Sequence, residues 1–352
     1  MTRQILFARA KRFVRHLFQH KAISIKRFNM SGVNPGYYVL AGVGGYILTS
    51  IFFLKCPIIY KKKRLLFKCS HISHRGGAAE KLENTCNAYR NAMECGTQML
   101  ELDVHLTADK VVVVSHDNHL LRTTGEDVHI KDTKYEDLPL LSKELGVTFH
   151  YHTTCHHEGN ALQIEKLEDV FQEFPNTPIH LDVKIYDEEL IQETNNLIRK
   201  YNREEITPWG NFSNKVTSKL YKTNPNIPLV FSMKRVALTV LTFYLGLLPF
   251  LPIKESCFAV IMPNIARKAF NPSMTESCGI RALFAVIDFL LMSNVLFTHL
   301  KDRGINVYLW VLNDEEDFKR AYKKLGVTGV MTDFPSKLND WLKEHPQYRS
   351  DD

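Results

Sequence analysis

Short apolar runs alternate with polar and amphipathic segments along the chain from residue 69 onward. Nine of these runs have the length and the β-branched composition of buried strands. Segments with helical spacing of apolar positions, such as 162–174, 188–201 and 315–325, separate most of them. Strands that alternate with helices in this way predict an α/β fold with a parallel sheet. The nine predicted strands are 69–74, 99–105, 111–116, 179–184, 206–211, 229–232, 258–262, 306–312 and 328–332.

The second and third predicted strands are separated by only five residues, 106–110. A parallel crossover needs a longer connection, so these two strands are expected to form an antiparallel hairpin. When the hairpin counts as one position, eight positions remain, as in a TIM (β/α)8 barrel. We therefore predict a TIM barrel over residues 69–345, followed by a polar tail at 346–352.

Residues 118–160 interrupt the alternation with polar, histidine-rich sequence. They follow the hairpin, on the face of the barrel where the loops of this fold build active sites. We interpret them as an insertion that covers the site. The histidines around Cys155 do not have the spacing of a familiar zinc site, so a solvated loop is the prediction for them.

A charge-free stretch of 18 residues, 37–54, lies near the N-terminus. It is just long enough to cross the hydrocarbon core of a bilayer, and tyrosines stand at its start. A cleaved signal peptide would have a shorter apolar stretch and a small-residue cleavage pattern. We predict a retained single transmembrane anchor between a basic segment, 1–36, and a basic juxtamembrane linker, 55–68.

The positive charge of the chain is concentrated in its N-terminal part. Residues 1–68 contain 14 Lys or Arg and no acid, whereas the rest holds 31 basic and 38 acidic residues. A folded domain without excess positive charge argues against nucleic-acid binding, and no protein partner is predicted. The basic start resembles a mitochondrial targeting segment, but the apolar span that follows favours endoplasmic reticulum or perinuclear membranes.

A second uncharged stretch, 236–253, follows the predicted strand 229–232. Three interpretations stay open: a second transmembrane helix, a buried helix of the barrel, or a helix that dips into the membrane near the barrel mouth. Pro249 and Pro252 shorten the part that can be regularly helical.

Three acidic side chains are predicted to point into the barrel. Glu101 and Asp103 are two residues apart on one strand and share a face, while their apolar neighbours Leu100, Leu102 and Val104 point the other way. Asp182 and Lys184 repeat this pattern on the next strand of the barrel. Buried carboxylates are costly unless they are paired or bind a metal. Three such groups suit a hard divalent cation, Mg²⁺ or Ca²⁺, and Arg75 with Lys184 complements a phosphate beside it.

Two histidines stand at the ends of predicted strands. His74 follows the first strand and His116 the third, so the fold brings both to the same face of the barrel. A single histidine at such a place is commonly structural. Two that converge with an arginine and three acids indicate general acid–base chemistry, because imidazole titrates near neutral pH.

Several ordered motifs resemble the glycerophosphodiester phosphodiesterase family, whose members have a TIM-barrel fold. The resemblance begins near His71 and extends to the C-terminal region. The motifs that carry it are H-R-G-G from His74, E-N-T from Glu83, E-L-D-V from Glu101, S-H-D from Ser115, a carboxylate-x-Lys strand at Asp182, W-V-L-N from Trp310 and G-V-M-T-D-F-P from Gly329.

The resemblance implies a role for each residue of these motifs. His74 and His116 would be the acid/base pair, and Arg75 and Lys184 the phosphate contacts. The metal ligands would be Glu101, Asp103 and Asp182, with Glu83, Asn84 and Trp310 in support. This chain has Asp182 where the family commonly has Glu, and the shorter side chain puts this ligand in doubt.

The anchor and the segment 236–253 resemble a membrane-bound branch of the family that acts as lysophospholipase D. That branch implies lysophospholipid substrates, among them lysophosphatidylcholine, lysophosphatidylethanolamine and N-acyl lysophosphatidylethanolamine. The products would be lysophosphatidic acid with choline, ethanolamine or N-acylethanolamine. Two alternatives are a hydrolase of water-soluble glycerophosphodiesters and a non-catalytic membrane lipid-binding protein.

Overall fold

The structure is a computed structural model that describes residues 34–150, 152–269 and 277–350. The chain divides into two units, residues 1–49 and 50–352. In the described part of the first unit, helix α2 (Pro35–Lys55) begins at a proline and continues into the second unit. Its segment Gly36–Lys55 is long and apolar enough to cross a membrane, as predicted for 37–54.

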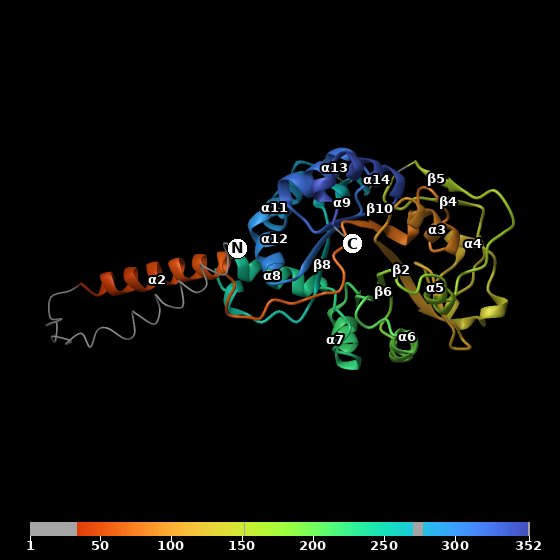
Figure 1. Cartoon of the computed structure of the whole chain (residues 1–352), viewed down its shortest axis with the longest axis horizontal. Helices are drawn as coiled ribbons and strands as arrows, with labels where there is room; N and C mark the ends of the chain where they lie inside the picture. The colour runs from red at the N-terminus through yellow and green to blue at the C-terminus, as the bar shows by residue number, and fades with distance from the viewer. Residues whose placement is uncertain (1–33, 151, 270–276, 351–352) are drawn as a thin grey trace. The chain divides into compact units, whose positions relative to one another are not determined.

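The second unit contains a barrel of parallel strands (Figure 1). The hydrogen-bonded order is β7-β6-β2-β1-β10-β9-β8, and every neighbouring pair in this order is parallel. The strands are β1 (His71–Ser73), β2 (Met99–Leu106), β6 (Ile179–Val183), β7 (Trp209–Gly210), β8 (Cys257–Ile261), β9 (Asn306–Trp310) and β10 (Gly329–Thr332). Strand β3 (Val112–Val114) pairs antiparallel with β2, which confirms the predicted hairpin.

The eighth position of the barrel is a segment with only two bridges. Leu229 pairs in parallel with Trp209 of β7, and Val230 pairs in parallel with Cys257 of β8, so this segment closes the circle. The predicted TIM barrel is confirmed. The predicted strands at 206–211 and 229–232 are longer than the ladders that the structure contains.

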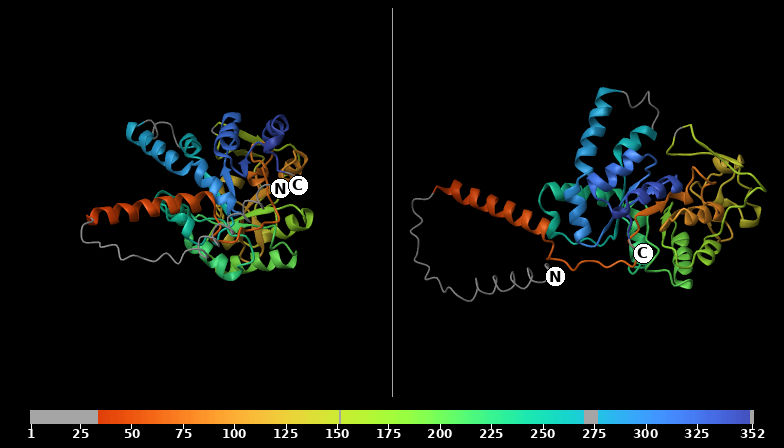
Figure 2. Two further views of the ribbon diagram at one scale, coloured as in Figure 1. Left: turned by 60° about the vertical axis from the view of Figure 1, so that its left-hand side comes forward. Right: turned by 45° about the horizontal axis from the view of Figure 1, so that its top comes forward.

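Helices surround the sheet (Figures 1 and 2). They are α3 (Cys86–Glu94), α4 (Leu121–Thr124), α5 (Leu167–Glu173), α6 (Glu188–Lys200), α7 (Asn214–Thr223), α8 (Met233–Tyr244), α9 (Pro263–Ala269), α11 (Cys278–Leu291), α12 (Asn294–Asp302), α13 (Glu315–Lys319) and α14 (Pro335–Glu344). A π-helical segment, Arg320–Leu325, continues α13. Single 3-10 turns occupy His74–Gly76, Ile130–Asp132, Tyr135–Asp137, Leu248–Phe250 and Pro346–Tyr348.

Strand β2 is buried along its whole length, and its two faces have different partners. Leu100, Leu102 and Val104 pack outward in a core cluster with residues of α5 and α6. Glu101 and Asp103 therefore point into the barrel, because successive side chains of a strand alternate between its faces. The apolar outer face determines the register and with it the inward position of both carboxylates.

The stretch 236–253 is neither one long helix nor fully buried. Helix α8 has 12 residues, which is about 18 Å and too short to cross a hydrocarbon core of about 30 Å. Val236 and Thr239 are its buried residues, so a fully buried barrel helix does not describe it either. Gly246 takes a positive φ of 71° and ends the helical path before the 3-10 turn at Leu248.

The insertion contains a short antiparallel pair, β4 (Glu144–Gly146) and β5 (Thr154–His156). Cys155 is buried in a small cluster with Leu82 and Leu145. Within the residues that the structure describes, the neighbouring histidines form no cluster that could hold a metal. His156 instead forms an exposed ion pair with Glu144.

Closure of the barrel depends on the missing side chain of Gly210. A Cβ at this position would lie 2.4 Å from the Cβ of Val230. Gly210→Ala should destabilise the fold by about 1–3 kcal/mol through overpacking, seen as a melting temperature several degrees lower. Gly146→Ala is the control, since a Cβ there meets nothing within 4 Å. Equal melting temperatures for the two variants would contradict this account of closure.

Candidate active site

A cavity of about 740 Å³, including its open mouth, lies at the carboxyl ends of the barrel strands. This is the face at which TIM barrels place their active sites. Eight of the predicted site residues line it: His74, Arg75, Glu101, Asp103, His116, Asp182, Lys184 and Trp310. Glu83 and Asn84, the other two, lie outside the lining but bind residues of it.

The loop after β1 owes its path to three consecutive residues with positive φ. They are Arg75 at 50°, Gly76 at 81° and Gly77 at 96°. A Cβ on Gly77 would lie 2.6 Å from the ring of Pro335, the first residue of α14. This close approach explains why glycine is needed there. The same turn directs the backbone N–H of Arg75 toward Glu101 Oε2, at 2.9 Å.

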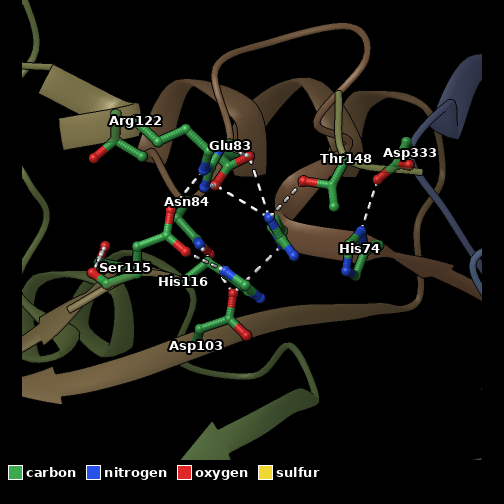
Figure 3. A network of polar contacts seen from close by, with 12 residues as sticks. His74, Glu83, Asn84, Asp103, Ser115, His116, Arg122, Thr148 and Asp333 are labelled. Atoms are coloured by element: carbon green, nitrogen blue, oxygen red, sulfur yellow. Dashed lines mark hydrogen bonds and ion pairs between the residues drawn. The ribbon is translucent and has the colours of Figure 1, made fainter. Parts of the chain in front are cut away.

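His74 is held by a buried carboxylate that was not among the predicted site residues. Its Nδ1–H donates to Asp333 Oδ1 at 2.7 Å, and Asp333 Oδ2 accepts from the amide of Asn313 at 3.0 Å. Burial of the imidazole opposes its protonation, but Asp333 and Glu101 outweigh this and raise the pKa of His74. The bond to Asp333, drawn in Figure 3, leaves Nε2 as the nitrogen for proton transfer.

His116 is held in the same way by its neighbour in the sequence. Its Nδ1–H donates to Asp117 Oδ1 at 2.7 Å, and Arg122 of α4 donates to the other oxygen at 2.5 Å. These contacts lower the pKa of Asp117 against the opposing effect of its partial burial. Both predicted acid/base histidines are therefore oriented through Nδ1 by a carboxylate that has its own hydrogen-bond donor.

Glu83 connects the two sides of this network. It accepts from Arg75 Nη1 at 3.2 and 3.3 Å and from Arg122 Nη2 at 2.6 Å. Burial acts to raise the pKa of Glu83, but the two guanidinium groups lower it. Asn84 donates to Asp103 Oδ2 at 3.1 Å and supports that carboxylate from behind. Figure 3 shows Arg122, Glu83, Asn84 and Asp103 within this network of contacts.

The three predicted metal ligands face one cavity. Asp103 and Asp182 are register partners on β2 and β6, and the ammonium of Lys184 lies between them at 2.6 and 2.7 Å. Burial disfavours the charge of Asp103, yet Lys184 and Arg75 lower its pKa. Burial and the neighbouring Asp103 raise the pKa of Glu101 to about 7.

The donor types at this place fit a hard divalent cation. Glu101, Asp103 and Asp182 offer carboxylate oxygens, the ligands that Mg²⁺ and Ca²⁺ prefer. The raised pKa of Glu101 reflects a carboxylate with too little positive charge beside it. Within the described residues, however, no group of three or more His, Cys, Asp or Glu has the arrangement of a ligand cluster. Lys184 supplies the cation between Asp103 and Asp182.

The part of the cavity lining that comes from the remaining strands of the barrel is mostly apolar. Trp310 packs edge-to-face against Phe149 at 6.0 Å and against Phe212 at 5.5 Å between ring centroids. Phe149 comes from the insertion and also packs against the ring of His74, so the insertion borders the site. The other apolar lining residues are Val230, Phe231, Met233, Ala259 and Met331.

The sequence prediction omitted several residues of the site. Asp333 lies within the quoted motif G-V-M-T-D-F-P and Asp117 follows His116, so both were detectable as polar residues next to predicted ones. Arg122, Phe149 and Phe212 carry no such signal. Arg122 lies on the short helix α4 of the insertion, and Phe149 and Phe212 lie in loops, so the local sequence does not specify that they reach the site.

His180 is a further histidine in the cavity and was not predicted. It is the register partner of Glu101, and burial lowers its pKa to about 4, so it is neutral at physiological pH. Its Nδ1 has no hydrogen-bond partner among the described residues. It therefore borders the carboxylates without supplying a charge.

The chain matches the glycerophosphoryl diester phosphodiesterase family over residues 74–337. It belongs to this family and is a phosphodiesterase of the TIM-barrel type. Human lysophospholipase D GDPD1 is 48% identical over 307 residues, which cover 87% of this chain and 96% of that protein. Human lysophospholipase D GDPD3 is 41% identical over 310 residues, with coverage of 88% and 96%.

Solved structures share the fold. The glycerophosphoryl diester phosphodiesterase domain of a Mycobacterium tuberculosis protein superimposes with a TM-score of 0.56 at 15% identity, covering 78% of this chain and 99% of that domain. An Oleispira antarctica phosphodiesterase, solved with its product sn-glycerol-3-phosphate, gives a TM-score of 0.52 at 18% identity, with coverage of 78% and 96%.

The bond between His74 and Asp333 should matter for turnover more than for substrate binding. Asp333→Asn removes the anionic acceptor that fixes the imidazole, and kcat should fall by about 10²-fold or more with little change in KM. Hydrolysis of a chromogenic phosphodiester measures both constants. Asp127→Asn, which affects the exposed pair Asp127–His119, is the control. A kcat equal to that of the control would exclude a role for the Asp333 bond.

The raised pKa of Glu101 predicts how stability depends on pH. The native state keeps a proton that the unfolded chain releases, so stability should fall as pH rises from about 4.5 to about 7. His74, also with a raised pKa, acts in the same direction. With a chelator present, the melting temperature of Glu101→Gln should therefore fall less between pH 5 and pH 8 than that of the parent protein.

A divalent cation that binds Glu101 compensates the free-energy cost of burying its ionised carboxylate. Mg²⁺ or Ca²⁺ should raise the melting temperature of the parent protein at pH 8 and raise that of Glu101→Gln less. Glu144→Gln, at an exposed position, should follow the parent in both experiments. Parallel profiles for all three proteins would rule out Glu101 as a cation ligand.

Proposed function

We propose that the protein is a metal-dependent lysophospholipase D. The observation that carries this proposal is the division of the cavity. The two carboxylate-anchored histidines, Arg75 and Lys184 come from the residues that follow β1, β3 and β6, whereas most of the aromatic and aliphatic lining comes from β8, β9, β10 and the segment at 229–231. A phosphodiester with a lipid tail matches both parts of the lining, whereas a small water-soluble phosphodiester uses only the first. The identity to human lysophospholipases D over most of the chain supports the same activity.

The proposed substrates are lysophosphatidylcholine, lysophosphatidylethanolamine and N-acyl lysophosphatidylethanolamine. Hydrolysis on the headgroup side of phosphorus gives lysophosphatidic acid and releases choline, ethanolamine or N-acylethanolamine. Such substrates reside in membranes, which agrees with a helix at Gly36–Lys55 that is long and apolar enough to span one. We propose a single-pass location in endoplasmic reticulum or perinuclear membranes, with mitochondrial targeting as the alternative.

The residues of the cavity have different roles in cleavage of the phosphodiester. Arg75 and Lys184 attract the phosphate and favour the charge that grows on its oxygens during attack. A Mg²⁺ or Ca²⁺ ion held by Glu101, Asp103 and Asp182 would add Lewis-acid stabilisation of the same charge. One histidine accepts the proton of the attacking hydroxyl, which belongs either to water or to the glycerol 2-hydroxyl of the substrate. The other donates a proton to the leaving alcohol. When the 2-hydroxyl attacks, the headgroup leaves as a cyclic phosphate forms, and a water molecule then opens the ring to give lysophosphatidic acid.

The supporting residues keep these groups in place. Asp333 and Asp117 hold Nδ1 of the two histidines, so that Nε2 of each can exchange protons. Glu83 orients Arg75, and Asn84 orients Asp103. Phe149 and Trp310 exclude water from one side of the phosphate and accommodate the apolar part of the substrate.

Headgroup release tests the proposal. Purified full-length protein with Mg²⁺ or Ca²⁺ should release choline from lysophosphatidylcholine, and chelation should abolish release. His74→Ala and His116→Ala should each lower kcat by about 10²-fold or more. His119→Ala, outside the cavity lining, should leave kcat unchanged.

The same assay with glycerophosphocholine separates the alternatives. A kcat/KM for glycerophosphocholine equal to or above that for lysophosphatidylcholine would assign the enzyme to water-soluble glycerophosphodiesters. Absence of release from both compounds, with no effect of His74→Ala, would leave only a lipid-binding role.

A further inference from the structure

Helix α11 has no buried residue in this fold. Its 14 residues, Cys278–Leu291, follow β8 and the helix α9, and Figure 2 shows it standing out from the barrel. Leu283 is 57% exposed and Phe289 is 74% exposed. Exposure of so much contiguous apolar surface to water is unfavourable, and such surfaces mark an interaction site.

Helix α12 limits what α11 can do. Together they form a segment, Cys278–Asp302, with the length and composition of a membrane span. Ser293 interrupts it, because its side chain caps the first turn of α12. From there Leu296, Phe297 and Leu300 are fully buried in the barrel core. The part free to enter a membrane is therefore α11 alone, about 21 Å long against a hydrocarbon core of about 30 Å.

The two faces of α11 differ. Arg281 and Asp288 lie on the side that borders a cavity toward α8 and the π-helical segment, and Asp288 forms an ion pair with Arg320 there. The opposite side carries Leu283, Val286, Ile287 and Leu290, at the spacing of one helical face, and all four are exposed. The charges are thus kept on the barrel side, and the outward face is wholly apolar.

The surroundings of α11 identify the bilayer as the partner of this face. Tyr244 at the end of α8 donates to the carbonyls of Phe289 and Leu290, at 3.3 and 3.1 Å. Just beyond it, the carbonyl of Gly246 accepts from Ser50, a residue of the candidate span Gly36–Lys55. Phe53 of the same span packs against Phe250 at 5.7 Å.

Leu241, Leu245 and Leu247 are exposed in the same turn of chain. The apolar surface is therefore continuous from the last turns of the candidate membrane span to α11.

We propose that α11 dips into the membrane leaflet from which the end of α2 emerges, without crossing it. The barrel then has two membrane contacts instead of one. Two contacts fix how the barrel is tilted over the membrane, whichever phosphodiester it hydrolyses.

Depth-dependent fluorescence quenching tests this proposal on the full chain. The exposed Cys56 and Cys278 and the partly exposed Cys95 are replaced by Ser, and one cysteine is added at a time for an environment-sensitive dye. The three labelled variants are V286C on the apolar face of α11, L48C in the candidate span, and Q192C on the exposed surface of α6. Each is reconstituted in phosphatidylcholine vesicles with or without lipids that carry a quencher on the acyl chain.

The dye at V286C should emit at shorter wavelength than at Q192C and lose emission to the acyl-chain quencher as it does at L48C. Emission at V286C that matches Q192C in wavelength and quenching would overturn the proposal. A blue shift without lipid quenching would overturn it as well, because a second copy of the chain would then cover the face. None of these readouts depends on catalytic activity, so failure of the proposed function leaves them unaffected.

Discussion

The charge balance inside the barrel is the constraint on which the rest of the site depends. Glu101 and Asp103 are directed inward because the apolar residues between them on β2 belong to the outer core. Carboxylates buried in this way require compensating cations. Arg75 comes from the loop after β1 and Lys184 from the end of β6, on either side of β2. The cations that we propose to bind the phosphate are therefore the same groups that compensate the buried acids.

This constraint explains the unusual backbone after β1. A positive φ at Arg75 costs conformational energy for a residue with a side chain. The turn places the backbone N–H of Arg75 on Glu101 and its guanidinium between Glu83 and Asp103. Those contacts offset the cost. The two glycines that follow allow close packing, of Gly76 against Tyr89 of α3 and of Gly77 against Pro335.

Much of the barrel could be predicted from the sequence, because strand periodicity and the short hairpin loop are local signals. The inward carboxylates of β2 followed from alternation alone. The sequence predicted that an eighth strand position exists, but not where it begins and ends. Residues 229–230 join the barrel through two single bridges and through packing against Gly210, and not through a long ladder. The sequence did not indicate that helix α11 is exposed, because its apolar composition is also that of a buried core helix. The aromatic lining of the cavity was not predicted, because Phe149 and Phe212 reach the cavity from loops.

Glu83 connects the barrel, through Arg75, with the insertion, through Arg122. It binds Arg75 in the cavity and Arg122 on α4, and Arg122 in turn binds the carboxylate of Asp117 that orients His116. Arg122 belongs to the same insertion that brings Phe149 over the cavity. A single segment outside the barrel strands, 118–160, thus provides both the aromatic border of the cavity and the support of the Asp117 carboxylate that orients His116.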